Sequence, residues 1–241
     1  MKVKFSIAIL VSISVFFAFA QWRSNLGDEY VVYQGIATDL KSDKLYYVEE
    51  HKELLSQHQL VETIIQYKDA AGEIIAKKVI DYSENKITPS FEQQDYRDGY
   101  VEGITYQGDK LVFKYRKSSS DKLKTKTISK PADLVVDGGF NYYIKAHWDE
   151  LLVGQSMVFN FAVPSQLDYF SFRLYKESNQ SDAVVFRMEP DNFILRNLVD
   201  PIRVTYKKST KRILKYEGLS NINDRGGKSY LVKIMYPKVG P

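Results

Sequence analysis

The chain has 241 residues, with 34 lysines and arginines, 30 aspartates and glutamates, three histidines and no cysteine. The absence of cysteine excludes disulfides, thiol nucleophiles and cysteine-ligated metal sites. The formal net charge of +4 is too close to neutral for this length to indicate nucleic-acid binding, and a hydrophobic fraction of 44% suffices for a sizeable core.

The first twenty residues have the pattern of a secretory signal peptide. A basic head over residues 1–4 precedes an apolar run over 5–17, and the small residues Ala18 and Ala20 stand where a signal peptidase cuts. The apolar run is shorter than the roughly 20 residues of a spanning helix, so we expect cleavage rather than an uncleaved anchor. The sequence therefore predicts a single β-rich domain over residues 21–241, exported or periplasmic, soluble, and without a stable membrane anchor.

The first half of this domain is predicted to consist of strands joined by tight turns. Residues 44–54 contain a Glu- and Leu-rich stretch that is compatible with a helix, but the β-favouring residues at its start indicate a long strand. Residues 91–98 are polar and receive no assignment. The predicted strands are 30–33, 44–54, 60–67, 74–82, 100–106 and 111–117.

A serine-rich stretch and a basic strand follow. Residues 118–122 have the composition of a linker. Residues 122–130 alternate basic residues with hydroxyl or apolar residues, a pattern typical of an exposed edge strand.

One helix is predicted, over residues 139–153. Apolar and aromatic residues recur there at helical spacing, together with His147. Gly154 is placed to end the helix, and Gly138 and Gly139 precede it as caps or as a hinge.

The remaining chain returns to strands at 156–163, 169–177, 183–189, 202–207, 213–219 and 230–236, with a short helical turn between 190 and 198. A helix with one apolar face must bury that face, and the sheet is its only large partner. The predicted fold is mainly β, a curved antiparallel sheet or incomplete barrel with one amphipathic helix packed on its concave face.

The apolar stripe of the helix supplies the candidate ligand site. Its residues either form core or make one wall of an apolar pocket between helix and sheet, a place that suits an acyl chain or another apolar ligand. The candidate pocket residues are Phe140, Tyr143, Ile144, Trp148, Leu151 and Leu152.

Other chemistries have weaker support. His51 and His58 lack the spacing of a metal site, and His147 is expected to be a partly buried histidine with a hydrogen-bonded ring. Glu49-Glu50, Asp95, Asp98 and Glu102 are carboxylates that could pair for general acid–base work, but such pairs are common on solvated surfaces. No Gly-x-Ser-x-Gly elbow occurs. We therefore predict no catalytic residues, no metal and no cofactor.

Several stretches resemble known sequences. The chain is similar to a group of exported bacterial proteins that share a domain of unknown function, and its order of elements resembles the periplasmic lipoprotein-carrier (LolA/LolB-like) fold, an incomplete barrel over a hydrophobic cavity. No catalytic or ligand residue is implied. The stretches are Tyr67-Lys68-Asp69 with Gly72 and Ala76-Lys77, Asp95-Tyr96-Arg97-Asp98-Gly99, Phe159-Asn160-Phe161-Ala162-Val163-Pro164-Ser165, Asp200-Pro201-Ile202, and Tyr216-Glu217-Gly218-Leu219-Ser220-Asn221-Ile222.

Three functional hypotheses follow. The first is a non-enzymatic periplasmic protein that binds an apolar ligand, a lipid or a lipoprotein in a half-barrel cavity. The second is a structural or interaction module of the cell envelope with a filled core, which would capture an envelope protein at the edge strand 122–130. The third, a hydrolase that uses Asp95, Asp98 or Glu102, ranks last because no nucleophile and base have a suitable spacing.

Overall fold

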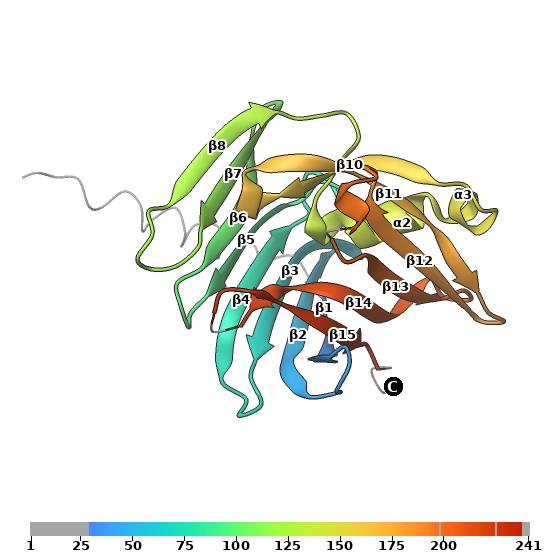
Figure 1. Cartoon of the computed structure of the whole chain (residues 1–241), viewed down its shortest axis with the longest axis horizontal. Coiled ribbons are helices and arrows are strands. Elements are labelled where there is room, and N and C mark those ends of the chain that lie inside the picture. The colour runs from blue at the N-terminus through green and yellow to red at the C-terminus, as the bar shows by residue number, and fades with distance from the viewer. Residues whose placement is uncertain (1–28, 198, 225, 238–241) are drawn as a thin grey trace, which may run out of the picture.

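The computed structural model describes residues 29–197, 199–224 and 226–237. Its strands form one antiparallel sheet in the order β8-β7-β6-β5-β4-β3-β2-β1-β15-β14-β13-β12-β11-β10-β9, with one parallel pair at the β9 edge. The sheet curves strongly around a short helical segment (Figure 1). The prediction of a mainly β, curved sheet with a helix on its concave face is confirmed. The predicted signal peptide lies outside the described residues.

The first meander contains β1 (Glu29–Asp39), β2 (Leu45–Ser56), β3 (Gln59–Lys68), β4 (Ile74–Asp81), β5 (Ser90–Asp95), β6 (Val101–Gln107), β7 (Lys110–Arg116) and β8 (Lys124–Ser129). Residues 44–54, whose sequence is compatible with a helix or a strand, fall almost entirely within the strand β2. The strand β5 forms where no strand was predicted. The strand β8 lies at the sheet edge and is largely exposed, as expected.

The second meander begins with β9 (Leu134–Val135) and continues with β10 (Met157–Val163), β11 (Asp168–Asn179), β12 (Ala183–Pro190), β13 (Ile202–Lys207), β14 (Arg212–Asn223) and β15 (Ser229–Met235). The two meanders join where β1 pairs with β15, with Ile36 opposite Met235 and Asp39 opposite Val232. The first and last of the described strands therefore lie side by side in the middle of the sheet.

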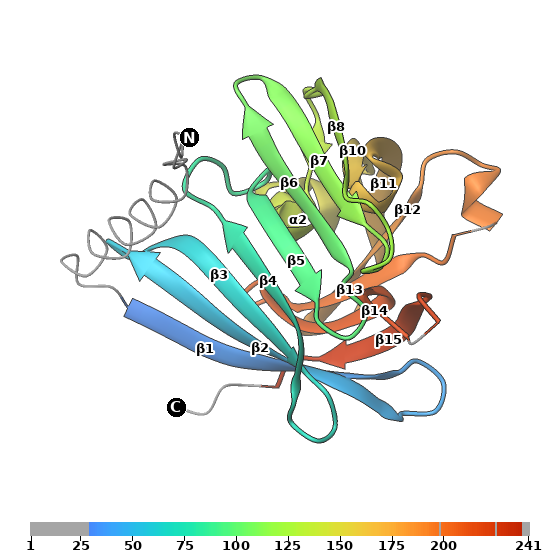
Figure 2. The same ribbon diagram turned by 90° about the vertical axis from the view of Figure 1, so that its left-hand side faces the viewer.

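The helical segment between the meanders is interrupted. A 3₁₀ turn η1 (Asp137–Gly139) leads into α2 (Phe140–Ala146), and α3 (Trp148–Leu152) follows a break at His147. The continuous helix predicted over 139–153 is thus two short helices. Gly154 follows with a φ of +95°, which fits its predicted role as the stop. Figure 2 shows α2 inside the curve of the sheet, behind β5 and β6.

Two further 3₁₀ turns complete the fold. The turn η2 (Pro164–Gln166) connects β10 to β11 and approaches β6 and β7. The turn η3 (Leu195–Asn197) lies in the β12–β13 connection, within the predicted helical turn. Within the described parts of the chain, no helix has the length and apolar character needed to cross a bilayer.

The buried side chains fall into two clusters with different neighbours. One cluster, around Tyr47, Tyr67 and Phe113, lies on the first meander and includes residues from both ends of the second, β9–β10 and β14–β15. The other joins the helices to β10–β13, around Ile144 and Phe186. The helices therefore bury their apolar stripe against the second meander, and α2 turns its opposite side toward the first.

Candidate functional site

A cavity of about 300 Å³ lies between the concave face of the sheet and α2. Tyrosines and charged groups are frequent in its lining, next to a smaller number of aliphatic side chains. The lining residues are Tyr33, Tyr47, Glu49, His51, Glu53, Leu60, Thr63, Ile65, Tyr67, Lys78, Ile80, Tyr82, Asp137, Gly138, Phe140, Asn141, Tyr142, Lys145, Val204, Tyr206, Ile213, Tyr216, Leu219, Ser220, Asn221, Ile234 and Tyr236.

One strand contributes a continuous polar row to this wall. Side chains on a strand alternate between its two faces, so every second residue of β2 points into the cavity. These residues are Tyr47, Glu49, His51 and Glu53. Glu49 and His51 are buried, with exposed fractions of 7% and 8%. Because buried polar groups are costly unless they are hydrogen-bonded, this row requires partners from neighbouring strands.

Glu49 is the centre of the resulting network. Its Oε2 lies 3.0 Å from His51 Nε2 and accepts a hydrogen bond of 3.1 Å from the Tyr236 hydroxyl. Gly35 makes room for this arrangement on the adjacent strand. A Cβ atom on Gly35 would lie 2.8 Å from the Tyr236 ring and 2.9 Å from Glu49 Oε2. The glycine therefore permits the close approach of the carboxylate and the phenol.

Tyr33 extends the network toward the end of β2. Its hydroxyl donates to Glu53 Oε1 at 3.1 Å, and its ring stacks on His51 with centroids 4.5 Å apart. Burial, followed by the charge of Glu53, raises the pKa of Tyr33 well above its usual range. Burial and the charge of Glu49 do the same for Tyr236. Both phenols therefore remain protonated donors at any ordinary pH.

An ion pair between a buried lysine and a half-exposed aspartate also lines the cavity. Lys78 on β4 has an exposed fraction of 1% and pairs with Asp137 at the start of η1. Asn221 Nδ2 donates to Asp137 Oδ2 at 3.1 Å, and Lys78 Nζ lies 4.5 Å from the centroid of the Phe91 ring. These contacts anchor the segment that precedes α2 to β4 of the first meander and to β14 of the second.

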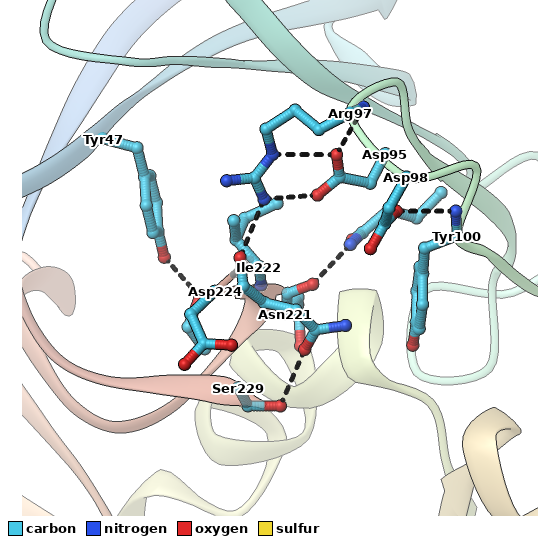
Figure 3. A network of polar contacts seen from close by, with 12 residues as sticks. Tyr47, Asp95, Arg97, Asp98, Tyr100, Asn221, Ile222, Asp224 and Ser229 are labelled. Carbon is cyan, nitrogen blue, oxygen red and sulfur yellow. Dashed lines mark hydrogen bonds and ion pairs between the residues drawn. The ribbon is translucent and has the colours of Figure 1, made fainter. Parts of the chain in front are cut away.

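The end of β14 crosses the interior of the sheet and closes the cavity on one side. Tyr47 shares a hydrogen bond of 2.6 Å with Ser220 Oγ, and Gln93 Nε2 donates to the carbonyl of Asn221 at 2.6 Å. Arg97, held by Asp95, donates to the carbonyl of Asn223 at 2.8 Å. Figure 3 shows these contacts converging on the 220–224 segment. Side chains from β2, from β5 and from the β5–β6 turn thus fix the position of this segment.

A second cavity, of about 150 Å³, lies beyond this segment and shares Asp137, Ser220 and Asn221 with the first. Glu102 lines it and accepts a 2.7 Å hydrogen bond from the Tyr100 hydroxyl. Burial raises the pKa of Glu102, while the nearby charge of Lys78 acts in the opposite direction. The second cavity is too small for a ligand of ordinary metabolite size.

The predicted pocket residues divide between the cavity and the core. Phe140 lines the cavity. Tyr143, Ile144, Trp148 and Leu151 are buried in the cluster against the second meander, and Leu152 packs against that cluster. This placement favours the core alternative for those five side chains. Asn141, Tyr142 and Lys145, on the other side of α2, face the cavity instead.

Gly138 and Gly139, which precede α2, pack closely against neighbouring segments of the chain. A Cβ atom on Gly139 would lie 1.9 Å from the carbonyl oxygen of Ile87, and the Tyr82 hydroxyl donates to the carbonyl of Gly138 at 2.8 Å. These contacts fasten the start of α2 to the β4 side of the sheet, which argues against a hinge at this point.

The remaining candidate residues are dispersed. Asp95 is held by Arg97, Asp98 accepts from the backbone N–H of Tyr100, and Glu102 lies in the second cavity. His58 lies in the β2–β3 turn, away from the cavity lining. His147 packs on the Tyr143 ring with centroids 4.6 Å apart, but its Nδ1 is buried without a hydrogen-bond partner among the described residues. His147 is therefore half-buried as expected, but the expected hydrogen bond is not formed at Nδ1. Within the described ranges, no three His, Asp or Glu side chains are grouped to hold a metal ion.

Sequence reasoning missed the polar row of β2. Its signal is the alternation of Tyr47, Glu49, His51 and Glu53, which share one face of a strand. Buried faces are normally recognised by apolar alternation, so a polar row is read as the solvated face.

Comparison with protein-family models, with curated proteins and with solved structures finds no match to this chain. The similarity to the lipoprotein-carrier fold therefore remains a prediction that no comparison tests.

Proposed function

We propose that the chain is an exported, non-enzymatic binding protein that holds a small amphipathic ligand in the cavity between the sheet and α2. The observation that carries the proposal is the cavity of about 300 Å³ with the buried polar row of β2 in its wall. Small-molecule sites are typically preformed concave spaces with a few convergent polar groups, and this volume is at the lower end of their range.

The two kinds of lining indicate how such a ligand would lie. Leu60, Ile65, Ile80 and Ile234 offer an apolar wall, and Phe140 extends it from α2. Glu49, His51 and Glu53 offer polar contacts along one strand. A ligand with an apolar body and one polar group matches both. This narrows the expected apolar cargo to an amphiphile of modest size.

A fluorescence titration with the neutral probe N-phenyl-1-naphthylamine tests the proposal. We expect saturable binding with one site per chain. Substituting Ile65→Trp should abolish binding, because Ile65 lines the cavity and the larger ring would fill it. Ile64→Trp is the matched control, since Ile64 is the neighbouring residue on the opposite face of β3.

Saturable binding that Ile65→Trp removes and Ile64→Trp retains supports a cavity ligand. Non-saturable binding, or equal loss in both variants when circular dichroism shows both to be folded, overturns the proposal.

A second candidate function rests on β8. This strand pairs only with β7 within the described sheet, and five of its six side chains are exposed. An exposed basic edge suits β-augmentation by an extended, acidic segment of an envelope protein. Lys126 contacts Asp168 at 2.6 Å, so Lys124 is the cleaner position for a charge reversal. Lys124→Glu should reduce the amount of partner cross-linked to the chain in its own cells, and an unchanged set of partners counts against this candidate.

A further inference from the structure

Resting on the proposed function, we propose that the polar group of the ligand is a cationic amine, bound at the end of the cavity formed by Glu49, Glu53 and the tyrosines around them. The inference concerns the chemical class of the ligand, which the cavity volume alone does not give.

The first support comes from the hydrogen bonds already made in the site. The Tyr33 hydroxyl donates its hydrogen bond to Glu53, and the Tyr236 hydroxyl donates its hydrogen bond to Glu49. A phenol has one proton to donate and an ionised carboxylate has none. What these four groups still offer to a ligand is therefore acceptor capacity, which a donor-rich ammonium group satisfies.

The second support comes from formal charge. Glu49, Glu53 and Asp137 line the cavity together with Lys78 and Lys145, so the carboxylates outnumber the ammonium groups by one. Lys78 is already paired with Asp137. Lys145 on α2 is attracted by Glu53 across the cavity. Of the three lining carboxylates, Glu49 is the one that has no lysine partner among the described residues. It is also more buried than Glu53.

His51 is the other lining group able to carry a positive charge, and it lies 3.0 Å from Glu49. Its ring is stacked on Tyr33 and lies edge-on to Tyr236, with centroids 6.1 Å apart. A protonated His51 would neutralise Glu49 without any ligand, which makes it the competing explanation for the surplus carboxylate. The two explanations differ in whether an external amine is preferred over a neutral ligand.

The third support comes from the aromatic rings. Tyr33, Tyr47, Tyr67 and Tyr236 line the same cavity. The face of an aromatic ring attracts a cation, and this attraction grows when water is excluded. Carboxylates combined with tyrosine rings form the environment that selects an organic ammonium group over a hydroxyl of similar size.

Calorimetric titration of the purified protein with three eight-carbon probes tests the inference. Octylammonium, 1-octanol and octanoate share one apolar chain and differ only in the head group. We expect octylammonium to bind about tenfold more tightly than 1-octanol, because it adds charge-assisted hydrogen bonds and cation–π contacts. Octanoate should bind most weakly, because Glu49 and Glu53 repel it.

Variants assign the preference to the site. Glu49→Gln should remove most of the tenfold preference for octylammonium over 1-octanol. Glu50→Gln is the matched control, since Glu50 is the next residue of β2, points to the outer face and pairs with Lys68. If Glu49→Gln fails to fold by circular dichroism, Glu53→Gln replaces it, because Glu53 is only half-buried.

The outcomes distinguish this inference from the proposed function. If 1-octanol binds as tightly as octylammonium, or octanoate binds best, the amine inference is wrong and cavity binding stands. If none of the three probes binds, both are wrong. A preference for octylammonium that persists in Glu49→Gln and in Glu53→Gln also overturns the assignment.

Discussion

Gly35 is the residue whose size the site constrains most directly. A Cβ atom there would meet Tyr236, Glu49 and Ile234, each within 2.9 Å. We expect Gly35→Ala to lower the free energy of unfolding by about 1–3 kcal/mol, the usual cost of overpacking an interior. Equilibrium urea denaturation measures this value.

Gln34→Ala is the control for Gly35→Ala, because Gln34 is the preceding residue of β1 and is exposed. Its effect should stay within about 0.5 kcal/mol, as for most surface substitutions. Equal stability of the Gly35 variant and the wild type would show that the strand relaxes and that the close approach to Glu49 is unimportant.

Lys78 is a buried charged residue whose burial requires the opposite charge of Asp137. Removing one partner of a buried ion pair leaves the other uncompensated. We expect Lys78→Met to cost about 3 kcal/mol, the lower end of the usual range, because the Asp137 side chain keeps an exposed fraction of 38%.

The double substitution Lys78→Met with Asp137→Asn tests the coupling of this pair. It should recover part of the loss, because Asp137 then no longer needs a counter-charge. Additive effects of the two substitutions in a double-mutant cycle would contradict the pairing.

At this scale the sequence was informative about Phe140 and uninformative about Lys78, Asp137 and Glu49. Their roles depend on which strands lie opposite one another across a curved sheet, and charged residues carry no sequence signal of burial. Composition predicts them on the surface.

One side of the helical segment packs into the core, and the other side lines the cavity. Its apolar stripe anchors α3 to the second meander: Trp148 has an exposed fraction of 3% and meets Phe186 and Tyr206 edge-on, with centroids 5.4 and 5.6 Å away. We expect Trp148→Ala to destabilise the fold by about 3–5 kcal/mol. Thermal and urea denaturation, followed by circular dichroism, measure the change.

Val153 provides the comparison on the same segment, because its exposed fraction is 77%. Val153→Ala should change stability by less than about 0.5 kcal/mol. Similar small effects in both variants would mean that α3 is not anchored by its tryptophan.

The strands were predictable where an apolar or aromatic residue occupied every second position, as in β7 with Leu111 and Phe113 facing inward. The strand β5 was not predicted because two of its inward positions hold polar residues, Gln93 and Asp95. Both are buried, and their hydrogen bonds to β14 and to Arg97 compensate for the burial. The break at His147 was also unpredictable, since local periodicity continues through it.

On the scale of the whole molecule, the buried phenols make stability depend on pH. Burial raises the pKa of Tyr47, Tyr67, Tyr82, Tyr206 and Tyr216, as it does for Tyr33 and Tyr236. The folded state therefore keeps protons that the unfolded state releases. The contribution is complete below the unfolded pKa of about 10 and is lost as the pH rises above it.

We therefore expect the free energy of unfolding to fall steeply above pH 10, by about 1.4 kcal/mol per pH unit for each such tyrosine. Urea denaturation at pH 8, 9.5, 10.5 and 11, with tyrosinate absorbance as a second signal, checks this. Ionisation of these phenols in a protein that stays folded at pH 11 would show that they are not buried.

The order of the strands could be predicted only within each meander, where tight turns make sequential strands neighbours. The pairing of β1 with β15 joins residues about 200 positions apart and has no local signal. The cavity depends on that pairing, because it brings Tyr236 and Ile234 next to Tyr33 and Glu49. The fold class could therefore be predicted from sequence, and the cavity lining, apart from Phe140, could not.

The most direct test of a ligand in this cavity uses the tyrosines as reporters. Eight of the eighteen tyrosines line it: Tyr33, Tyr47, Tyr67, Tyr82, Tyr142, Tyr206, Tyr216 and Tyr236. In protein labelled with ¹³C at the tyrosine ring, saturating N-phenyl-1-naphthylamine should shift ring signals of this group. The signals of Tyr96 and Tyr175, which do not line the cavity, should stay in place. Shifts at Tyr96 and Tyr175 as large as those at the lining tyrosines, or no shift at any tyrosine, would contradict the account.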